Sequence, residues 1–123
     1  MLINFFEKYN KLSWIITLII AGIIFYISAR QFGKGGVSYG YLSYIYHFFA
    51  FFFLSIFLLI SMTKGKNKSF VFPAILIAIA YGISDEIHQF FVPFRSCNYS
   101  DALLNSIGIL YAGVFYTILR FRK

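Results

Sequence analysis

Four long apolar runs, separated by short polar segments, constrain the fold of this chain more than any other feature. They cover approximately residues 12–29, 41–62, 70–92 and 101–119. As a helix, a run of roughly 18 or more apolar residues spans a hydrocarbon core about 30 Å thick. We therefore predict an all-α, polytopic membrane protein in which four transmembrane helices form one small bundle, with residues 1–123 as a single domain.

Composition excludes several other classes of protein. Of the 123 residues, 60% are hydrophobic and only 12% are charged, whereas a soluble domain is roughly one quarter charged. The net charge of +7 does not indicate a nucleic-acid partner, because the basic residues stand at the ends of the apolar runs and form no basic-aromatic patch. The single cysteine, Cys97, excludes an intrachain disulfide and a cysteine-rich metal site.

Lys8 and Lys11 precede the first apolar run, as basic residues do in a signal peptide. The run is longer than a usual signal-peptide core, and the sequence that follows it, at 28–30, is a poor cleavage site. We therefore interpret the run as the first transmembrane helix.

The basic residues are distributed unevenly over the two sides of the predicted bundle. The side with both termini carries eight of them: Lys8, Lys11, Lys64, Lys66, Lys68, Arg120, Arg122 and Lys123. The other side carries three: Arg30, Lys34 and Arg95. The positive-inside rule thus predicts a cytoplasmic-membrane protein with both termini in the cytoplasm and the 93–100 loop on the extracytoplasmic side.

Polar residues gather in the stretch 81–113, which holds three of the four carboxylates. The candidates there are Asp85, Glu86, His88, Gln89, Arg95, Asp101 and Asn105. Ionisable groups within a membrane are costly, so such a cluster is a functional-site hypothesis. At 1.5 Å per residue, His47 in the second run lies about 9 Å from the outer surface, close to the depth of Asp85, His88 and Asn105.

The spacing also predicts which faces meet. Asp85, His88 and Gln89 share one face of the third helix. Glu86 is turned by about 100°, so the spacing leaves open whether it faces the site or a neighbouring packing surface. On the fourth helix, Asp101 and Asn105 continue into a stripe of small residues at 108 and 112, which favours close helix packing. We expect the two stripes to face each other, with Arg95 reaching over them.

The run YGISDEIHQFFVPFRSCNYSDALLNSIGILYAG resembles the signature of the VanZ-like family of small membrane proteins, in which an Asp-Glu pair and a Gln precede an Arg, an Asp, an Asn and a Gly. FYISARQFG and YIYHFFAFFFLS resemble two weaker blocks of that family, with a serine ending helix one and a histidine early in helix two. One departure is the segment 43–46 before His47, Ser-Tyr-Ile-Tyr, where many members have an Asp-Lys pair. The resemblance implies a four-helix envelope protein associated with reduced susceptibility to glycopeptide antibiotics such as teicoplanin, and it implies no particular reaction.

The charge of the cluster limits its ligands. Three ionised carboxylates with Arg95 alone would leave a charge of −2, so a bound proton, a cationic histidine, a metal ion or a cationic ligand must compensate. His47, Asp85, His88 and Asp101 have the ligand types for a metal, but the sequence fixes no ligand geometry, so we assign neither a metal nor another cofactor.

Three classes of function stay open. As an enzyme on a lipid-linked or anionic envelope substrate, the protein would use Asp85, His88 and Asp101 for catalysis. Substrate binding would then fall to Arg95, Gln89, Asn105, Glu86 and His47. The same site would suit a small transporter, flippase or proton relay. The cluster would also serve a structural subunit as a hydrogen-bonded network that sets helix packing. Beyond the lipid bilayer, the sequence identifies no partner and no oligomeric state.

Overall fold

The computed structural model describes residues 2–29, 40–93 and 99–122, and all regular structure in these ranges is helical. This confirms the predicted all-α fold class. The elements are α1 (Leu2–Lys8), α2 (Asn10–Ala29), α3 (Gly40–Thr63), the 3-10 turn η1 (Lys68–Phe70), α4 (Val71–Phe90) and α5 (Tyr99–Phe121).

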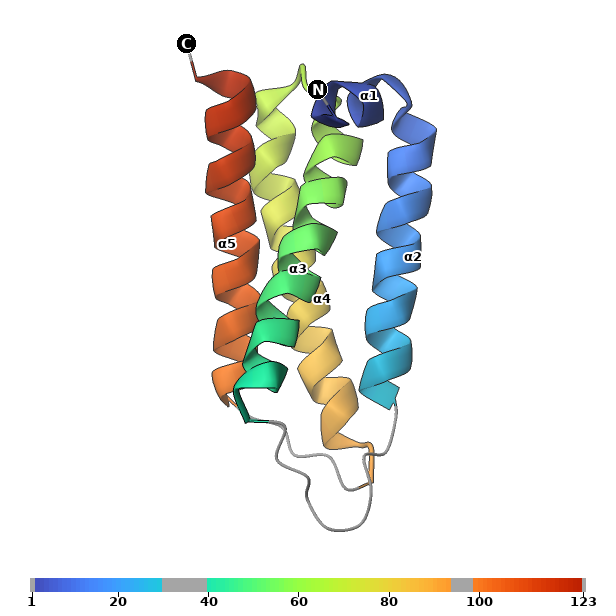
Figure 1. The fold of residues 1–123 in the computed structure, drawn as a ribbon, viewed down its shortest axis with the longest axis vertical. Helices are drawn as coiled ribbons and strands as arrows, with labels where there is room; N and C mark the ends of the chain where they lie inside the picture. The colour runs from blue at the N-terminus through green and yellow to red at the C-terminus, as the bar shows by residue number, and fades with distance from the viewer. Residues whose placement is uncertain (1, 30–39, 94–98, 123) are drawn as a thin grey trace.

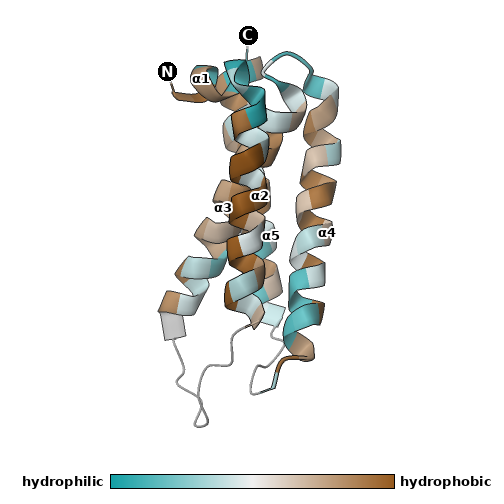
Figure 2. Cartoon of the chain, turned by 90° about the vertical axis from the view of Figure 1, so that its right-hand side faces the viewer, coloured by the Kyte–Doolittle hydropathy of each residue, from teal (hydrophilic) through white to brown (hydrophobic). Residues whose placement is uncertain are grey.

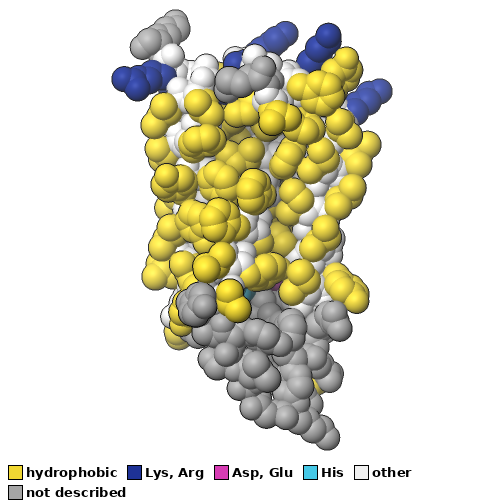
Figure 3. All heavy atoms as spheres, in the orientation of Figure 1, with side chains coloured by type: hydrophobic (Ala, Val, Ile, Leu, Met, Phe, Trp, Pro, Cys, Tyr) yellow, Lys and Arg dark blue, Asp and Glu magenta, His cyan; other side chains and the backbone are white. Residues whose placement is uncertain are grey.

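Within the described ranges, the four helices α2 to α5 are each long and apolar enough to cross a membrane. They run side by side along one long axis, and both termini lie at the same end of the bundle (Figure 1). Hydrophobic side chains cover the visible face of the bundle, whereas the dark blue Lys and Arg side chains gather at the terminal end (Figure 3). The chain is therefore a multi-pass membrane protein, and α2 to α5 correspond to the four predicted runs to within about two residues at each boundary.

Helix α1 was not expected from the sequence. This short helix lies across the terminal end of the bundle and turns at Tyr9 into α2 (Figure 1). The Ser13 hydroxyl donates a hydrogen bond of 2.6 Å to the backbone carbonyl of Phe6, which fixes the angle between the two helices. Phe6 also packs edge to face on Phe57 of α3, so α1 has an apolar anchor of its own.

Helix α3 is the centre of the bundle, because it packs against α2, α4 and α5. Its side chains Phe51, Leu54 and Leu59 are at most 3% exposed, and Ile109 and Tyr116 of α5 are completely buried against this core. Burial of large side chains in this way stabilises packing through many weak contacts. The helix that carries His47 is thereby fixed relative to the other three.

Gly108 shows how closely α3 and α5 approach. A methyl group at this position would collide with the backbone carbonyl oxygen of Phe48 and would lie 3.3 Å from the backbone nitrogen of Phe52. Small residues permit such close approach of transmembrane helices. The small stripe of the last helix therefore meets α3 at Gly108, whereas the sequence had suggested the third predicted helix, α4, as its neighbour.

Candidate functional site

The predicted site residues of the described ranges belong to the first turns of α3 and α5 and to the last turns of α4. These turns lie at the end of the bundle opposite the termini, where α4 becomes strongly hydrophilic (Figure 2). Those buried to 5% exposure or less are His47, Asp85, Glu86, Gln89 and Asn105. The Asp101 side chain is 14% exposed. Polar groups are rarely buried without partners, so the contacts of these side chains define what the site does.

A chain of polar contacts joins three helices. His47 on α3 places its Nδ1 atom 2.9 Å from Oδ1 of Asn105 on α5. The Nδ2 atom of Asn105 donates to Oε1 of Glu86 on α4 over 3.4 Å. The two contacts agree on the orientation of the Asn105 amide, with its oxygen toward the histidine and its nitrogen toward the carboxylate.

Asp101 approaches the same histidine from the other side. Its Oδ2 atom lies 3.6 Å from Nε2 of His47. One ligand atom each of His47, Glu86 and Asp101 lies within 4.8 Å of the other two. We call His47, Glu86, Asp101 and Asn105 the polar cluster; its members come from three helices and are far apart in the sequence.

Asp85 and Gln89 form a second contact on α4. The Gln89 side-chain amide donates a hydrogen bond of 3.2 Å to Oδ2 of Asp85, one helical turn away. Both residues are buried. Although Asp85 and Glu86 are neighbours in the sequence, it is Glu86 that contacts α5 through Asn105.

His88 does not share the direction expected for it. Its Nδ1 atom lies 3.3 Å from the hydroxyl of Ser28 on α2, and its ring stacks on Phe25 at a centroid distance of 4.7 Å. The predicted face of Asp85, His88 and Gln89 is therefore divided, because His88 is directed to α2. Ser28 was not predicted as a site residue, although the serine-containing block at the end of the first helix was a sequence signal for it.

Arg95 and Cys97 lie outside the described residues, so the predicted placement of Arg95 over the cluster stays a prediction.

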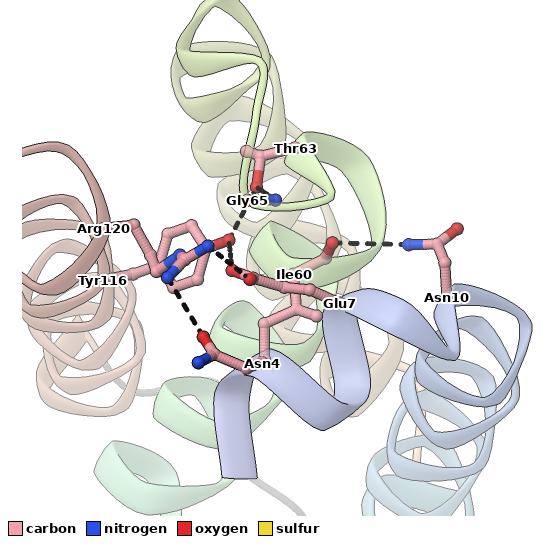
Figure 4. Close-up of polar contacts among 8 residues, drawn as sticks. All are labelled: Asn4, Glu7, Asn10, Ile60, Thr63, Gly65, Tyr116 and Arg120. Atoms are coloured by element: carbon pink, nitrogen blue, oxygen red, sulfur yellow. Dashed lines mark hydrogen bonds and ion pairs between the residues drawn. The ribbon is translucent and has the colours of Figure 1, made fainter. Parts of the chain in front are cut away.

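A second polar cluster lies at the terminal end and was not predicted (Figure 4). We call it the terminal cluster. Nη2 of Arg120 lies 2.7 Å from Oε2 of Glu7, and the Tyr116 hydroxyl donates to Oε1 of Glu7 over 2.8 Å. The hydroxyls of Thr63 and Tyr116 lie 2.7 Å apart, and Arg120 also donates to Asn4 over 3.0 Å. The sequence signal was the one carboxylate, Glu7, outside the 81–113 stretch.

These helices define a polytopic membrane protein, and imidazole, amide and carboxylate groups are buried together inside its bundle. The family described as VanZ/LLP1 matches residues 3–120, nearly the whole chain. The chain therefore belongs to the VanZ/LLP1 family, in agreement with the resemblance of residues 81–113. No curated protein and no solved structure matches the chain.

Proposed function

We propose that this protein uses the polar cluster to bind the anionic head group of a lipid-linked envelope substrate at the outer surface of the cell membrane. The observation that supports the proposal is the convergence of polar side chains from α3, α4 and α5 at the end of the bundle opposite the termini. A head group would contact these side chains while its acyl or prenyl chains stay in the lipid around the helices. In this proposal the protein has the family's role in reduced susceptibility to glycopeptides such as teicoplanin.

The distribution of charge supports an outward-facing cluster. In the described ranges the terminal end carries Lys8, Lys11, Lys64, Lys66, Lys68, Arg120 and Arg122. Basic residues of short loops and ends are retained in the cytoplasm, so the opposite end faces outward.

Cys97, the single cysteine, tests this orientation. In intact cells, a membrane-impermeant maleimide should label wild-type protein. A Lys66→Cys variant in a Cys97→Ser background is the matched control and should be labelled only after the membrane is permeabilised. If the Lys66→Cys variant were labelled in intact cells and Cys97 of the wild-type protein were not, the proposed orientation would be reversed.

The substrate is tested on protein extracted with its native lipids. Mass spectrometry should find a phosphorylated, lipid-linked compound retained by wild type and lost from Asp101→Asn and Glu86→Gln. Retention of the same bulk lipids by all three proteins would contradict the proposal. Turnover of labelled lipid by wild type but not by Asp85→Asn, His88→Gln or Asp101→Asn would add the predicted catalytic roles to binding.

A structural role is the second candidate, and a specific observation favours it. The contacts from His47 through Asn105 to Glu86 connect α3, α5 and α4 within the bundle. Buried polar networks set helix register even without a ligand. Under this alternative, Asn105→Ala would impair assembly of the bundle, and wild type would retain no specific lipid.

A further inference from the structure

We infer that His47, Glu86 and Asp101 form a binding site for one divalent ion of the Zn²⁺ or Mn²⁺ class. One imidazole nitrogen and two carboxylate oxygens lie within 4.8 Å of one another. The three residues come from α3, α4 and α5, so the ion would sit where three helices meet. The site itself stands on this geometry, and only its role toward substrate rests on the proposed function.

Asn105 determines which nitrogen of His47 can bind an ion. Its Oδ1 atom carries no hydrogen, so the 2.9 Å contact requires the proton of a neutral His47 to be on Nδ1. We assign the proton from this network, and the Nδ2 contact of Asn105 with Glu86 supports the assignment. The lone pair of the neutral ring is then on Nε2 and faces Asp101. Metal-binding histidines are oriented in this way by a hydrogen bond at the other ring nitrogen.

The distance between His47 and Asp101 favours a shared ion over a direct hydrogen bond. Nε2 and Oδ2 lie 3.6 Å apart. A charge-assisted hydrogen bond between nitrogen and carboxylate oxygen spans about 2.7–2.9 Å. Two ligands at about 2.1 Å from a tetrahedral ion are roughly 3.4 Å apart. The observed separation therefore matches two ligands of one ion, and a small inward movement would complete the set with Glu86.

The types of ligand indicate the class of ion. Imidazole suits Zn²⁺ and other transition metals, whereas sites for Mg²⁺ and Ca²⁺ use oxygen ligands. Three protein ligands also leave at least one coordination position for water or substrate, as in catalytic zinc sites. A phosphate oxygen at that position would reach a buried acidic cluster that otherwise repels anions. The ion would thus explain how carboxylates contribute to binding an anionic head group.

The chain supplies a matched control for the histidine ligand. His88 is the only other histidine, and its ring is held by Ser28 and Phe25 of α2. It is not part of the group with His47, Glu86 and Asp101. His88→Gln therefore changes the same residue type on a helix of the same bundle without removing a proposed ligand.

The test is metal binding by the full chain in detergent after removal of bound metal with a chelator. Calorimetric titration with Zn²⁺, Mn²⁺ and Mg²⁺ should show one site that prefers Zn²⁺ or Mn²⁺. Loss of an outer-shell partner costs about 10- to 100-fold in metal affinity, which we expect for Asn105→Ala. We expect at least about 100-fold for His47→Gln and Glu86→Gln, and no change for His88→Gln. Gel filtration and thermal unfolding identify variants that no longer fold.

Three outcomes would overturn the inference: folded wild type that binds none of these ions, a preference for Mg²⁺, or the same affinity in His47→Gln as in wild type. Co²⁺ loaded into the site gives a second measurement, since its visible absorption should change in Glu86→Gln and not in His88→Gln. Lipid retention is measured separately. One-site metal binding without a retained lipid would uphold the ion and refute the proposed function, whereas lipid retained by metal-free protein with no metal affinity would do the reverse.

Discussion

The two ends of the bundle both contain buried acidic residues, but they hold them in different ways. At the terminal end, Glu7 forms an ion pair with Arg120 at 2.7 Å and accepts a hydrogen bond from Tyr116 at 2.8 Å. At the opposite end, the polar cluster brings one imidazole and two carboxylates within 4.8 Å of one another. His47 lies 3.6 Å from Asp101, and the Asn105 amide lies 3.4 Å from Glu86. The Glu7 carboxylate has a cationic partner at short distance, which stabilises the fold. Two carboxylates beside one imidazole instead leave negative charge that a cationic ligand can compensate.

The terminal cluster also has an ordered set of donors and acceptors. The backbone N–H of Gly65 donates to Thr63 over 3.2 Å, and Tyr116 donates its proton to Glu7. The Thr63 hydroxyl must then donate to Tyr116, since Tyr116 has used its only proton. Each hydrogen bond in this series from Gly65 to Glu7 therefore has one donor and one acceptor. The comparison therefore predicts large stability effects at the terminal cluster and small ones at the polar cluster.

The largest effect is expected from Glu7→Ala. The change leaves Arg120 without its carboxylate, and breaking a buried ion pair costs about 3–5 kcal/mol. Because Arg120 is 29% exposed, solvent screens part of this cost, and we expect about 2–3 kcal/mol of lost stability, including the hydrogen bond from Tyr116. Chemical unfolding in micelles measures the change, while metal and lipid binding should stay as in wild type. Unchanged unfolding would show that the terminal cluster does not stabilise the bundle.

Gly108→Ala should have the next largest effect. The added methyl group would collide with the carbonyl oxygen of Phe48, and overpacking of this kind costs about 1–3 kcal/mol. Gly22→Ala is the matched control, because a methyl group there meets no atom within 4 Å. Thermal unfolding should separate the two variants. Since Asn105 precedes Gly108 by one turn, the substitution should also weaken ligand binding, and equal stability of the two variants would contradict the close approach of α3 and α5.

Thr63→Val should cost about 1 kcal/mol, the usual contribution of a hydrogen bond between neutral groups. The variant keeps the shape of the side chain and removes the donor to Tyr116. Ser84→Ala serves as the control, since the exposed Ser84 hydroxyl bonds only to the backbone of its own helix at Tyr81. Unfolding midpoints of the two variants can be compared directly. A larger loss in Ser84→Ala would show that the hydroxyl chain at the terminal end has no special role.

The smallest stability effect is expected from Glu86→Gln. The amide still accepts from Asn105, so the unfolding free energy should change by less than about 1 kcal/mol. The variant should nevertheless no longer retain the lipid-linked compound or bind the divalent ion tightly. A stability loss as large as that of Glu7→Ala would remove the distinction between the two ends and would favour the structural role.

The fold class could be predicted from the sequence because the length of an apolar run determines whether it can span a membrane. Helix α1 was missed, since a short segment with Phe5 and Phe6 has too few residues to show a helical period. Its helix forms against the bundle, where Phe6 packs on Phe57 and Glu7 meets Arg120. Tertiary contacts of this kind are not visible in a local pattern.

For the site residues, the sequence predicted the position along each helix better than the direction in which each side chain points. Position along a helix follows from a count of residues, so His47 and Asn105 were expected at one depth and are 2.9 Å apart. The rotation of each helix is set by its packing, as where Gly108 lies against Phe48. That rotation turns Glu86 toward α5 and His88 toward α2, which no spacing within α4 could decide.

The position of Gly65 beside Glu7 constrains the order in which parts of the chain fold. It adopts φ +67° in the turn after α3, and a side chain there would collide with the Glu7 carboxylate. Glu7 thus reaches its final position only beside a finished α3–α4 connection and beside Arg120 of α5, which is synthesised after the other three membrane helices. Helix α1 is consequently fixed only after α5, although it precedes the whole bundle in the sequence. A truncation before Arg120 should yield an inserted bundle whose head stays accessible to protease.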